Sequence, residues 1–401
     1  MLFHPGPSAI KYTNYAIYKL LVMNKIFNPF LVHGYVDPDY FCDRQEDTRK
    51  LISALKNGRN ITLMSPRRMG KTGLIKNAFY HIKQQEPDAM CFYMDIFSTM
   101  CLNDFILLLG QTIVGKLDSF SQKALTTLTN FFKSCRLVFS SDPLSGTPQV
   151  SLDFQPDQAQ ATLKEIFDYL GQSGKECYVA IDEFQQITNY PEKGVEALLR
   201  SYIQFLPRVH FIFSGSKQHL MNEIFFSAKR PFYRSTEKIN LQAIPFEDYF
   251  SFARNWMEKG GKRLDEAMFE RIYRRFDGHT WYVQYILNRL YEQCQPLIDE
   301  NLIEACLTDI VQSEVDSYQL LFGMLTENQS TLLRAIAREK VVEAINGSAF
   351  IKKYRLKGSS SINSALKVLM DKEYVFKSDK GYRVYDRFME LWLQALPYGN
   401  L

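Results

Sequence analysis

The stretch from Ser65 to Thr72, SPRRMGKT, contains the residue types needed to bind the phosphates of a nucleotide. Such a loop needs backbone N–H groups that converge on the phosphates, a lysine that neutralises the β and γ charge, and a hydroxyl that holds Mg²⁺. A helix that starts at the loop adds the positive end of its dipole. Serine stands where the usual loop opens with glycine, and because serine is small we expect the loop to close. The predicted phosphate-binding residues are Ser65, Pro66, Arg67, Arg68, Met69, Gly70, Lys71, Thr72 and Gly73.

Two carboxylates follow a second apolar run, CYVAIDEF, at residues 177–184. Asp182 at the end of this run can hold Mg²⁺ together with Thr72, and Glu183 can polarise the attacking water in phosphoryl transfer. The alternative interpretation is that both acids simply open the following helix. A further apolar run, VHFIFSGS at 209–216, ends in Ser216, which we predict to sense the terminal phosphate. An ordinary turn at the end of a strand is the competing interpretation there.

The elements that carry these residues follow from the hydrophobic pattern. Between residues 60 and 216, short β-branched and apolar runs alternate with amphipathic helical patterns, which predicts a parallel sheet covered by helices on both faces. Residues 140–158, rich in Ser, Pro and Gly, are predicted to form a loop. From about Pro245 to Leu325 the pattern is helical throughout, which predicts a separate all-helical unit.

The last part of the chain has three helical patterns followed by two short strands around Asp379-Lys380-Gly381. Helix, helix, helix and hairpin is the layout of a winged helix. Residues 326–401 hold 13 Lys and Arg against 8 Asp and Glu, a net charge of +5, while the whole chain carries only +4. Such a domain can contact DNA phosphates through lysines and arginines, or it can pack on the protein or bind a protein partner. The basic candidates are Lys352, Lys353, Arg355, Lys357, Lys377, Lys380 and Arg383.

Three segments together, SPRRMGKTGL, YVAIDEFQQI and FIFSGSKQHLM, resemble the archaeal-type ATPases of the AAA+/STAND group of P-loop NTPases. The resemblance implies a P-loop NTPase sheet of the AAA+/ASCE type, a helical lid and a C-terminal winged helix, with ATP and Mg²⁺ as cofactors. Upstream, Arg44 matches an arginine near the base and ribose, whereas Asp43 departs from the family's glycine. Downstream, Arg234 matches an arginine that acts on the γ-phosphate. In the lid segment FDGHTWYVQYI, Thr280 replaces the family's proline.

These observations predict a domain organisation and a function. The expected domains are an N-terminal extension at 1–33, a P-loop ATPase core at 34–240, a helical lid at 241–325 and a winged helix at 326–401. The leading hypothesis is an ATPase, with slow turnover, that acts as a nucleotide-driven conformational switch; Glu183, Lys71 and Arg234 are its expected catalytic residues. One rival is a regulator that binds DNA or protein around a structural nucleotide. Another is an interaction scaffold with an inactive loop.

Composition restricts the class of protein further. The 401 residues are 46% hydrophobic and 14% aromatic, which is enough for folded cores. Seven dispersed cysteines without a CxxC pair favour free thiols in a reducing cytoplasm. No run of 18 apolar residues occurs, so no membrane partner is expected. Met23 is a candidate alternative start, which would make residues 1–22 an upstream extension.

Overall fold

The computed structural model describes residues 27–42, 44–114, 116–117, 128–141, 148–378 and 380–397. The expectations for Met23, Asp43 and Asp379 therefore lie outside the described residues. The chain forms two compact units. One comprises residues 31–252 and 278–281, and the other comprises residues up to 30, 253–277 and 282–401.

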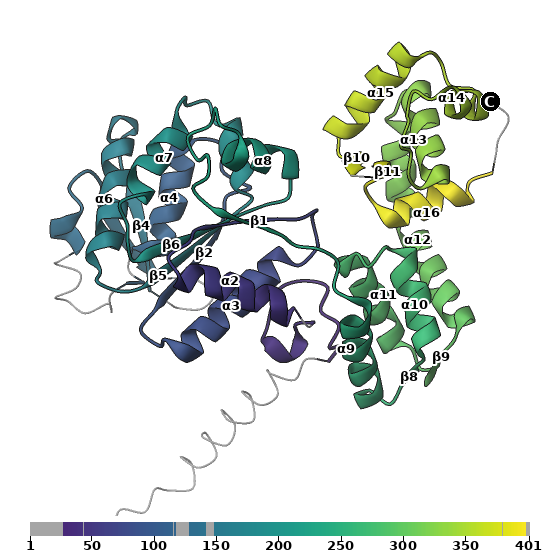
Figure 1. The fold of residues 1–401 in the computed structure, drawn as a ribbon, viewed down its shortest axis with the longest axis horizontal. Coiled ribbons are helices and arrows are strands. Elements are labelled where there is room, and N and C mark those ends of the chain that lie inside the picture. The colour runs from purple at the N-terminus through teal and green to yellow at the C-terminus, as the bar shows by residue number, and fades with distance from the viewer. Residues whose placement is uncertain are drawn as a thin grey trace, which may run out of the picture. The chain divides into compact units, whose positions relative to one another are not determined.

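The first unit is built on a five-stranded sheet in the order β2-β5-β6-β1-β7. Four of these strands, β1, β2, β5 and β6, are labelled in Figure 1. All neighbouring strands run parallel, so their carboxyl ends meet at one edge of the sheet. The prediction of a mainly parallel sheet flanked by helices is thereby confirmed. The edge strand β7 was not expected, because its four residues EKIN show no apolar run. The strands are β1 (Ile61–Met64), β2 (Met90–Asp95), β5 (Cys177–Asp182), β6 (Val209–Gly215) and β7 (Glu237–Asn240).

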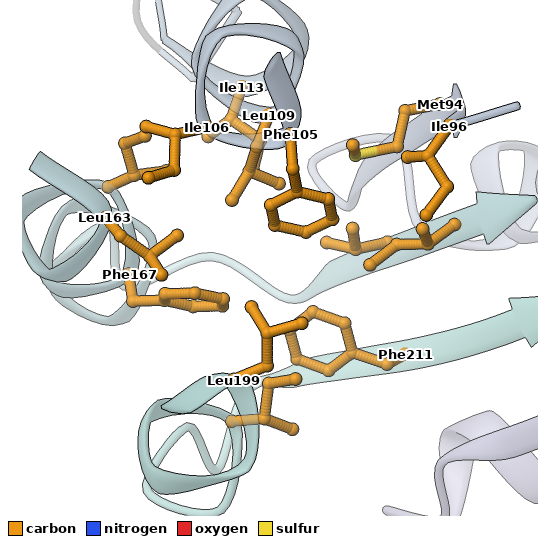
Figure 2. Packing of buried hydrophobic residues seen from close by; sticks show 14 of the residues in the cluster. Met94, Ile96, Phe105, Ile106, Leu109, Ile113, Leu163, Phe167, Leu199 and Phe211 are labelled. Carbon is orange, nitrogen blue, oxygen red and sulfur yellow. The ribbon is translucent and has the colours of Figure 1, made fainter. Parts of the chain in front are cut away.

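Helices cover both faces of this sheet. Successive residues of a strand point to opposite faces, so each buried strand contributes side chains to the core on either side. In β5, Tyr178 and Ala180 pack with α2 (Gln45–Lys56) and α3 (Lys71–Gln85). Val179 and Ile181 belong to the larger core on the other face. Figure 2 shows part of this core, including Phe105 and Phe211. The helices on that face are α4 (Leu102–Ile113), α6 (Ala159–Gln172), α7 (Val195–Ile203) and α8 (Gln218–Phe226).

The predicted loop at 140–158 is wrong in part. Its first two residues end β3 (Arg136–Ser141), which pairs antiparallel with β4 (Pro148–Asp153) inside the predicted loop. Val150 and Leu152 alternate along β4 and are buried, and this short period-two pattern was hidden by the polar residues around it. A Cβ on Gly110 of α4 would lie 2.1 Å from Leu152 Cδ1, so the glycine permits this close packing.

The region predicted as all-helical contains α9 (Phe246–Lys259), α10 (Glu266–Arg275), α11 (Thr280–Glu292) and α12 (Glu300–Gly323). Two strands of two residues each, β8 (Arg263–Leu264) and β9 (Leu297–Ile298), pair in parallel between these helices. Strands this short leave no periodicity to detect in a sequence. In the described part of the chain, no helix has both the length and the apolar character needed to cross a bilayer.

The predicted winged-helix layout is present at the end of the chain. The antiparallel pair β10 and β11 is extended by a bridge between Val342 and Tyr382. Gly381 has φ 128°, and a Cβ there would lie 2.4 Å from the Val342 carbonyl oxygen, so the turn requires glycine. The elements are α13 (Glu327–Glu339), α14 (Ser348–Tyr354), α15 (Ser359–Asp371), β10 (Val375–Ser378), β11 (Gly381–Val384) and α16 (Arg387–Ala395). Among the described residues, the short 3₁₀ helices are η1 (Pro38–Tyr40), η2 (Pro156–Gln158) and η3 (Phe184–Asn189).

Candidate functional site

The loop between β1 and α3 contains the residues predicted to bind phosphate. Gly70 is the N-cap of α3 with φ 95°, a conformation that glycine adopts without steric cost. Ser65 is fully buried, and its hydroxyl donates to the Pro66 carbonyl over 2.9 Å, so the serine bonds within the loop. A Cβ on Gly73 would lie 2.9 Å from the Phe41 ring, which explains the small residue one position after Thr72. The loop therefore closes with serine at its start.

Lys71, the first residue of α3, directs its ammonium into this loop. The side chain is 6% exposed, and Nζ lies 3.3 Å from the Ser65 carbonyl oxygen and 3.4 Å from that of Pro66. Burial lowers the pKa of Lys71, while the nearby charges of Glu183 and Asp182 oppose that shift. The loop thus holds a desolvated cation at a helix N-terminus, where the helix dipole also favours an anion.

Asp182, at the carboxyl end of β5, links the loop to the sheet. Thr72 Oγ1 donates to Asp182 Oδ2 over 2.9 Å, and the Tyr93 hydroxyl donates to the same oxygen over 2.7 Å. The Glu183 backbone N–H donates to Oδ1 over 3.1 Å. Threonine hydroxyl and carboxylate oxygens are the ligands that Mg²⁺ accepts beside substrate phosphates, so Thr72 and Asp182 fit the predicted metal site.

Glu183 is held in place by two hydrogen-bond donors. Its backbone has φ 55°, an uncommon conformation for a residue other than glycine. The Ser216 hydroxyl at the end of β6 donates to Glu183 Oε2 over 2.7 Å, and Gln185 Nε2 donates to the same oxygen. Ser214, two residues earlier on β6, is fully buried. The structure therefore brings Ser216 to the predicted base, and both residues lie at the sheet edge that carries Asp182.

Arg44 contacts the phosphate loop through its guanidinium group. Its guanidinium is buried, and it donates to the Met69 carbonyl over 2.9 Å and to the Gln242 carbonyl over 3.0 Å. It also pairs with Asp47 over 3.1 Å and donates to Thr280 Oγ1 over 3.2 Å. Through these contacts the guanidinium group joins the phosphate loop to the segment that contains Thr280. The family resemblance implies that Arg44 lies near the base and ribose of the nucleotide, and this stays a prediction.

The two arginines inside the loop each lie over an aromatic ring. The guanidinium carbon of Arg68 is 4.3 Å from the centroid of the Trp281 ring, and that of Arg67 is 5.5 Å from the centroid of Phe97. Trp281 is fixed in turn by a hydrogen bond from its indole N–H to the Val32 carbonyl over 3.2 Å. Both arginines remain exposed, so a phosphate role for them also stays a prediction.

Arg234 is not part of the cluster around Lys71. It lies after α8 with φ 53°, is exposed, and has its guanidinium carbon 5.2 Å from the centroid of the Tyr233 ring. Among the described residues, its contacts do not include the phosphate loop, Asp182 or Glu183. Its action on the γ-phosphate stays a prediction.

The sequence reasoning missed three polar residues at the same sheet edge: Tyr93, Asp95 and Gln185. Asp95 ends β2 opposite Asp182 in the parallel register. Desolvation raises the pKa of Asp95, and repulsion from Asp182 and Glu183 adds to that rise. The sequence contains a signal for Asp95, because this acid ends the apolar run of β2 as Asp182 ends that of β5. Tyr93 gave no such signal, since an aromatic residue within a strand is usually part of a core.

Residues 316–395 match a family model described as a probable winged helix domain. No curated protein sequence matches the chain. A Walker-type ATPase of Pyrococcus abyssi has a similar structure at 17% identity and a TM-score of 0.60, covering 91% of this chain and 99% of that one. The chain shares the fold of that ATPase. The predicted likeness to P-loop ATPases of the AAA+ type is thus confirmed at the level of the fold.

Two further solved structures have the same architecture. The Aeropyrum pernix ORC2 protein in complexes with ADPNP and ADP has 15% identity and a TM-score of 0.55, covering 91% of this chain and 95% of its own. The ORC1 protein of the same organism, in complex with DNA, has 11% identity and a TM-score of 0.51, covering 92% and 96%. At these identities the likeness establishes the fold, namely a mainly parallel sheet with helices on both faces followed by a helical region and a winged helix.

Proposed function

We propose that this protein binds ATP with Mg²⁺ and hydrolyses it slowly, as a conformational switch coupled to its winged helix. The observation that carries the proposal is the cluster of Lys71, Thr72, Asp182 and Glu183 at one edge of the sheet, with the Thr72 hydroxyl 2.9 Å from the Asp182 carboxylate. A lysine, a hydroxyl and two acids in this arrangement are what phosphoryl transfer to water requires. Bound Mg²⁺ supplies positive charge that offsets the negative charge of the phosphates.

Each residue of the cluster has a separate role in this proposal. Lys71 neutralises the β and γ charge, and the start of α3 presents N–H groups to the phosphates. Thr72 and Asp182 hold the metal. Glu183 orients the attacking water, and its hydrogen bonds from Ser216 and Gln185 restrain it in the structure described here. Because a restrained base has to rotate before it can act, the proposal includes slow turnover.

The proposed organisation keeps the domains expected from the sequence: core at 34–240, lid at 241–325 and winged helix at 326–401. The nucleotide-bound ORC2 neighbour and the Walker-type ATPase support nucleotide binding in this fold. A second candidate, DNA binding by the winged helix, is supported by the ORC1 neighbour in complex with DNA and by the net charge of +5 in this domain. A protein partner for the same domain is the alternative.

Two substitutions test the proposal. Lys71→Ala removes the buried cation and is expected to weaken ATP binding by at least about 100-fold, because a charge-assisted contact is lost where phosphate would lie. Glu183→Gln keeps the shape of the side chain but not the base, so binding is retained while turnover falls by about 100-fold or more. Lys83→Ala, an exposed lysine on the same helix, is the control. Binding is measured by calorimetry and turnover by phosphate release, with and without duplex DNA.

Three outcomes separate the hypotheses. Normal turnover in Glu183→Gln contradicts the assignment of the base. Binding without turnover in the unsubstituted protein favours a regulator with a structural nucleotide. Absence of binding at millimolar nucleotide favours a scaffold with an inactive loop.

A further inference from the structure

The winged-helix domain contains a second concave site, remote in sequence from the phosphate loop. A cavity of about 480 Å³ lies between α13, the turn after α14 and the first turn of α15, and we call it the α13–α15 pocket. All of its lining residues belong to one compact unit. Sites that bind small organic molecules typically measure about 300–1,000 Å³. The pocket is therefore large enough to hold a ligand rather than a few waters.

The lining of this pocket is strongly cationic. It contains five basic side chains and one carboxylate, Glu327; the basic residues are Arg334, Arg338, Lys353, Arg355 and Lys357. Arg334 and Arg338 lie one turn apart on α13 and donate to the carbonyls of Pro397 and Leu396 over 2.7 and 2.8 Å. These bonds hold the two guanidinium groups beside the cavity. Lys353 pairs with Glu339 over 2.5 Å.

The two remaining cations lie in the turn between α14 and α15. Arg355 has φ 51°, a left-handed conformation that costs free energy in a residue with a side chain. The side chains of Arg355 and Lys357 are exposed, and within the described residues neither has a hydrogen-bond or ion-pair partner. The turn thus presents two positive charges at the pocket without a protein anion to balance them.

The rest of the lining divides into a polar and an apolar part. Ser361 lies in the first turn of α15, a helix of 13 residues whose N-cap, Gly358, has no side chain to bond the first N–H groups. The positive end of that helix dipole adds to the attraction for an anion. The pocket is also lined by the apolar residues Leu332, Ala335, Leu356 and Ile362. This lining is suited to a ligand that joins an anionic group to a partly apolar organic group.

We propose that the α13–α15 pocket binds a nucleoside phosphate, independently of the phosphate loop. Arginine, serine hydroxyl and a helix N-terminus together favour phosphate over a single carboxylate, because phosphate accepts more hydrogen bonds in more directions. The apolar part of the lining fits a nucleobase or sugar edge. A free nucleotide and the terminal nucleotide of a nucleic-acid strand share this chemistry, and the experiment below distinguishes them.

AMP is the probe for the free ligand, because it lacks the β- and γ-phosphates that Lys71 is proposed to contact. We expect calorimetry on the full chain to show one AMP site whose affinity is unchanged in Lys71→Ala. A short single strand with a 5′-phosphate, compared with the same strand without it, probes the strand end. Binding of AMP assigns the pocket to a free nucleotide, and binding of the phosphorylated strand alone assigns it to a strand end. Binding of neither overturns the proposal.

Paired substitutions locate the site. The double variant Arg355→Glu with Lys357→Glu is expected to weaken binding by at least about tenfold, since two attractive charges become repulsive. Thr331→Trp fills the cavity without a change of charge and is expected to abolish binding. Lys367→Glu with Lys372→Glu makes the same charge change on exposed positions of α15 and its C-cap and leaves binding intact. Equal losses in the two double variants contradict the pocket, as do unchanged affinities in all three. Circular dichroism verifies that each variant is folded.

Discussion

One oxygen of Asp182 accepts two hydrogen bonds, from Thr72 over 2.9 Å and from Tyr93 over 2.7 Å. Desolvation and the Asp182 charge raise the pKa of Tyr93, so its hydroxyl stays protonated and competes with a metal ion for this oxygen. Tyr93→Phe removes that competitor. Because one hydrogen bond contributes about 1 kcal/mol, the Mg²⁺ concentration for half-maximal turnover is expected to fall roughly fivefold.

The control for this substitution is Tyr178→Phe. Tyr178 is also a strand tyrosine whose hydroxyl contacts a carboxylate, that of Glu86, over 3.3 Å, but it lies at the opposite end of β5 from Asp182. The variant is expected to keep the normal Mg²⁺ requirement. A higher Mg²⁺ requirement in Tyr93→Phe would mean that the tyrosine orients Asp182 for the metal and does not compete with it.

A site residue can be predicted from sequence when its position follows from the helix or strand that contains it. Lys71, Thr72 and Asp182 come together because they sit at the ends of a buried helix and strand, whose positions follow from hydrophobic pattern. Arg44 and Arg234 have long side chains whose partners depend on distant segments. The family resemblance implies a role at the nucleotide for both, and these roles stay predictions; the structure has Arg44 buried against Met69 and Thr280, and Arg234 exposed. Nothing local in the sequence specifies those partners.

At the scale of elements, the phosphate loop is tied to the segment 278–281, which belongs to the same compact unit as the sheet. Arg44 bonds Thr280, and Arg68 lies over Trp281. A partly exposed cation–π contact contributes about 0.5–1 kcal/mol. The last two residues of this segment, Thr280 and Trp281, are the first residues of α11.

The prediction at this scale concerns Arg68→Ala. In a chain where Trp256 and Trp392 are replaced by phenylalanine, the fluorescence of Trp281 reports the segment alone. Loss of the guanidinium is expected to shift its emission and to increase quenching by acrylamide, because one face of the indole becomes exposed. Arg67→Ala, which affects the ring of Phe97 instead, is the matched control. Identical spectra for the two variants would show that Arg68 does not cover Trp281 in solution.

Elements themselves were predictable where the pattern was long. In the winged helix, α13 and α15 are amphipathic over 13 residues each, whereas β5 and β6 are continuous, mainly apolar runs of six and seven residues. The β3–β4 pair was missed because its apolar alternation covers only a few positions within a polar stretch. Its burial depends on a contact, Leu152 against Gly110, between residues far apart in sequence. Contacts of that kind have no local signature.

For the whole molecule, the two compact units are interleaved along the chain. Residues 278–281 belong to the unit with the sheet, while the residues on both sides of them belong to the other unit. A cut after residue 252 therefore separates the unit with the sheet from Thr280, the partner of Arg44. The sequence pattern located the change from mixed to helical structure near Pro245, but it could not show that four residues return to the first unit.

Within the other unit, a buried ionic cluster joins the wing to the helices before and after it. Glu390 of α16 is 3% exposed and pairs with Arg387 over 2.8 Å and with Arg383 of β11 over 3.4 Å. Arg383 also pairs with Asp277, which follows α10. Burial raises the pKa of Glu390 to about 7; repulsion from Asp277 adds to this, while Arg383 and Lys340 oppose it.

This cluster predicts a dependence of stability on pH. Because the pKa of Glu390 is higher in the folded protein than its ordinary value of 4.5, the folded state binds a proton more tightly than the unfolded chain. The associated stability is fully present below about pH 4.5 and is lost as the pH rises through about 7, on the order of 3 kcal/mol in all. Glu390→Gln cannot titrate and is expected to flatten this slope, whereas the exposed Glu343→Gln keeps it. Denaturation followed by Trp392 on the same helix, in a chain whose other tryptophans are phenylalanine, measures both slopes. If Glu390→Gln retains the full slope, another group carries the proton.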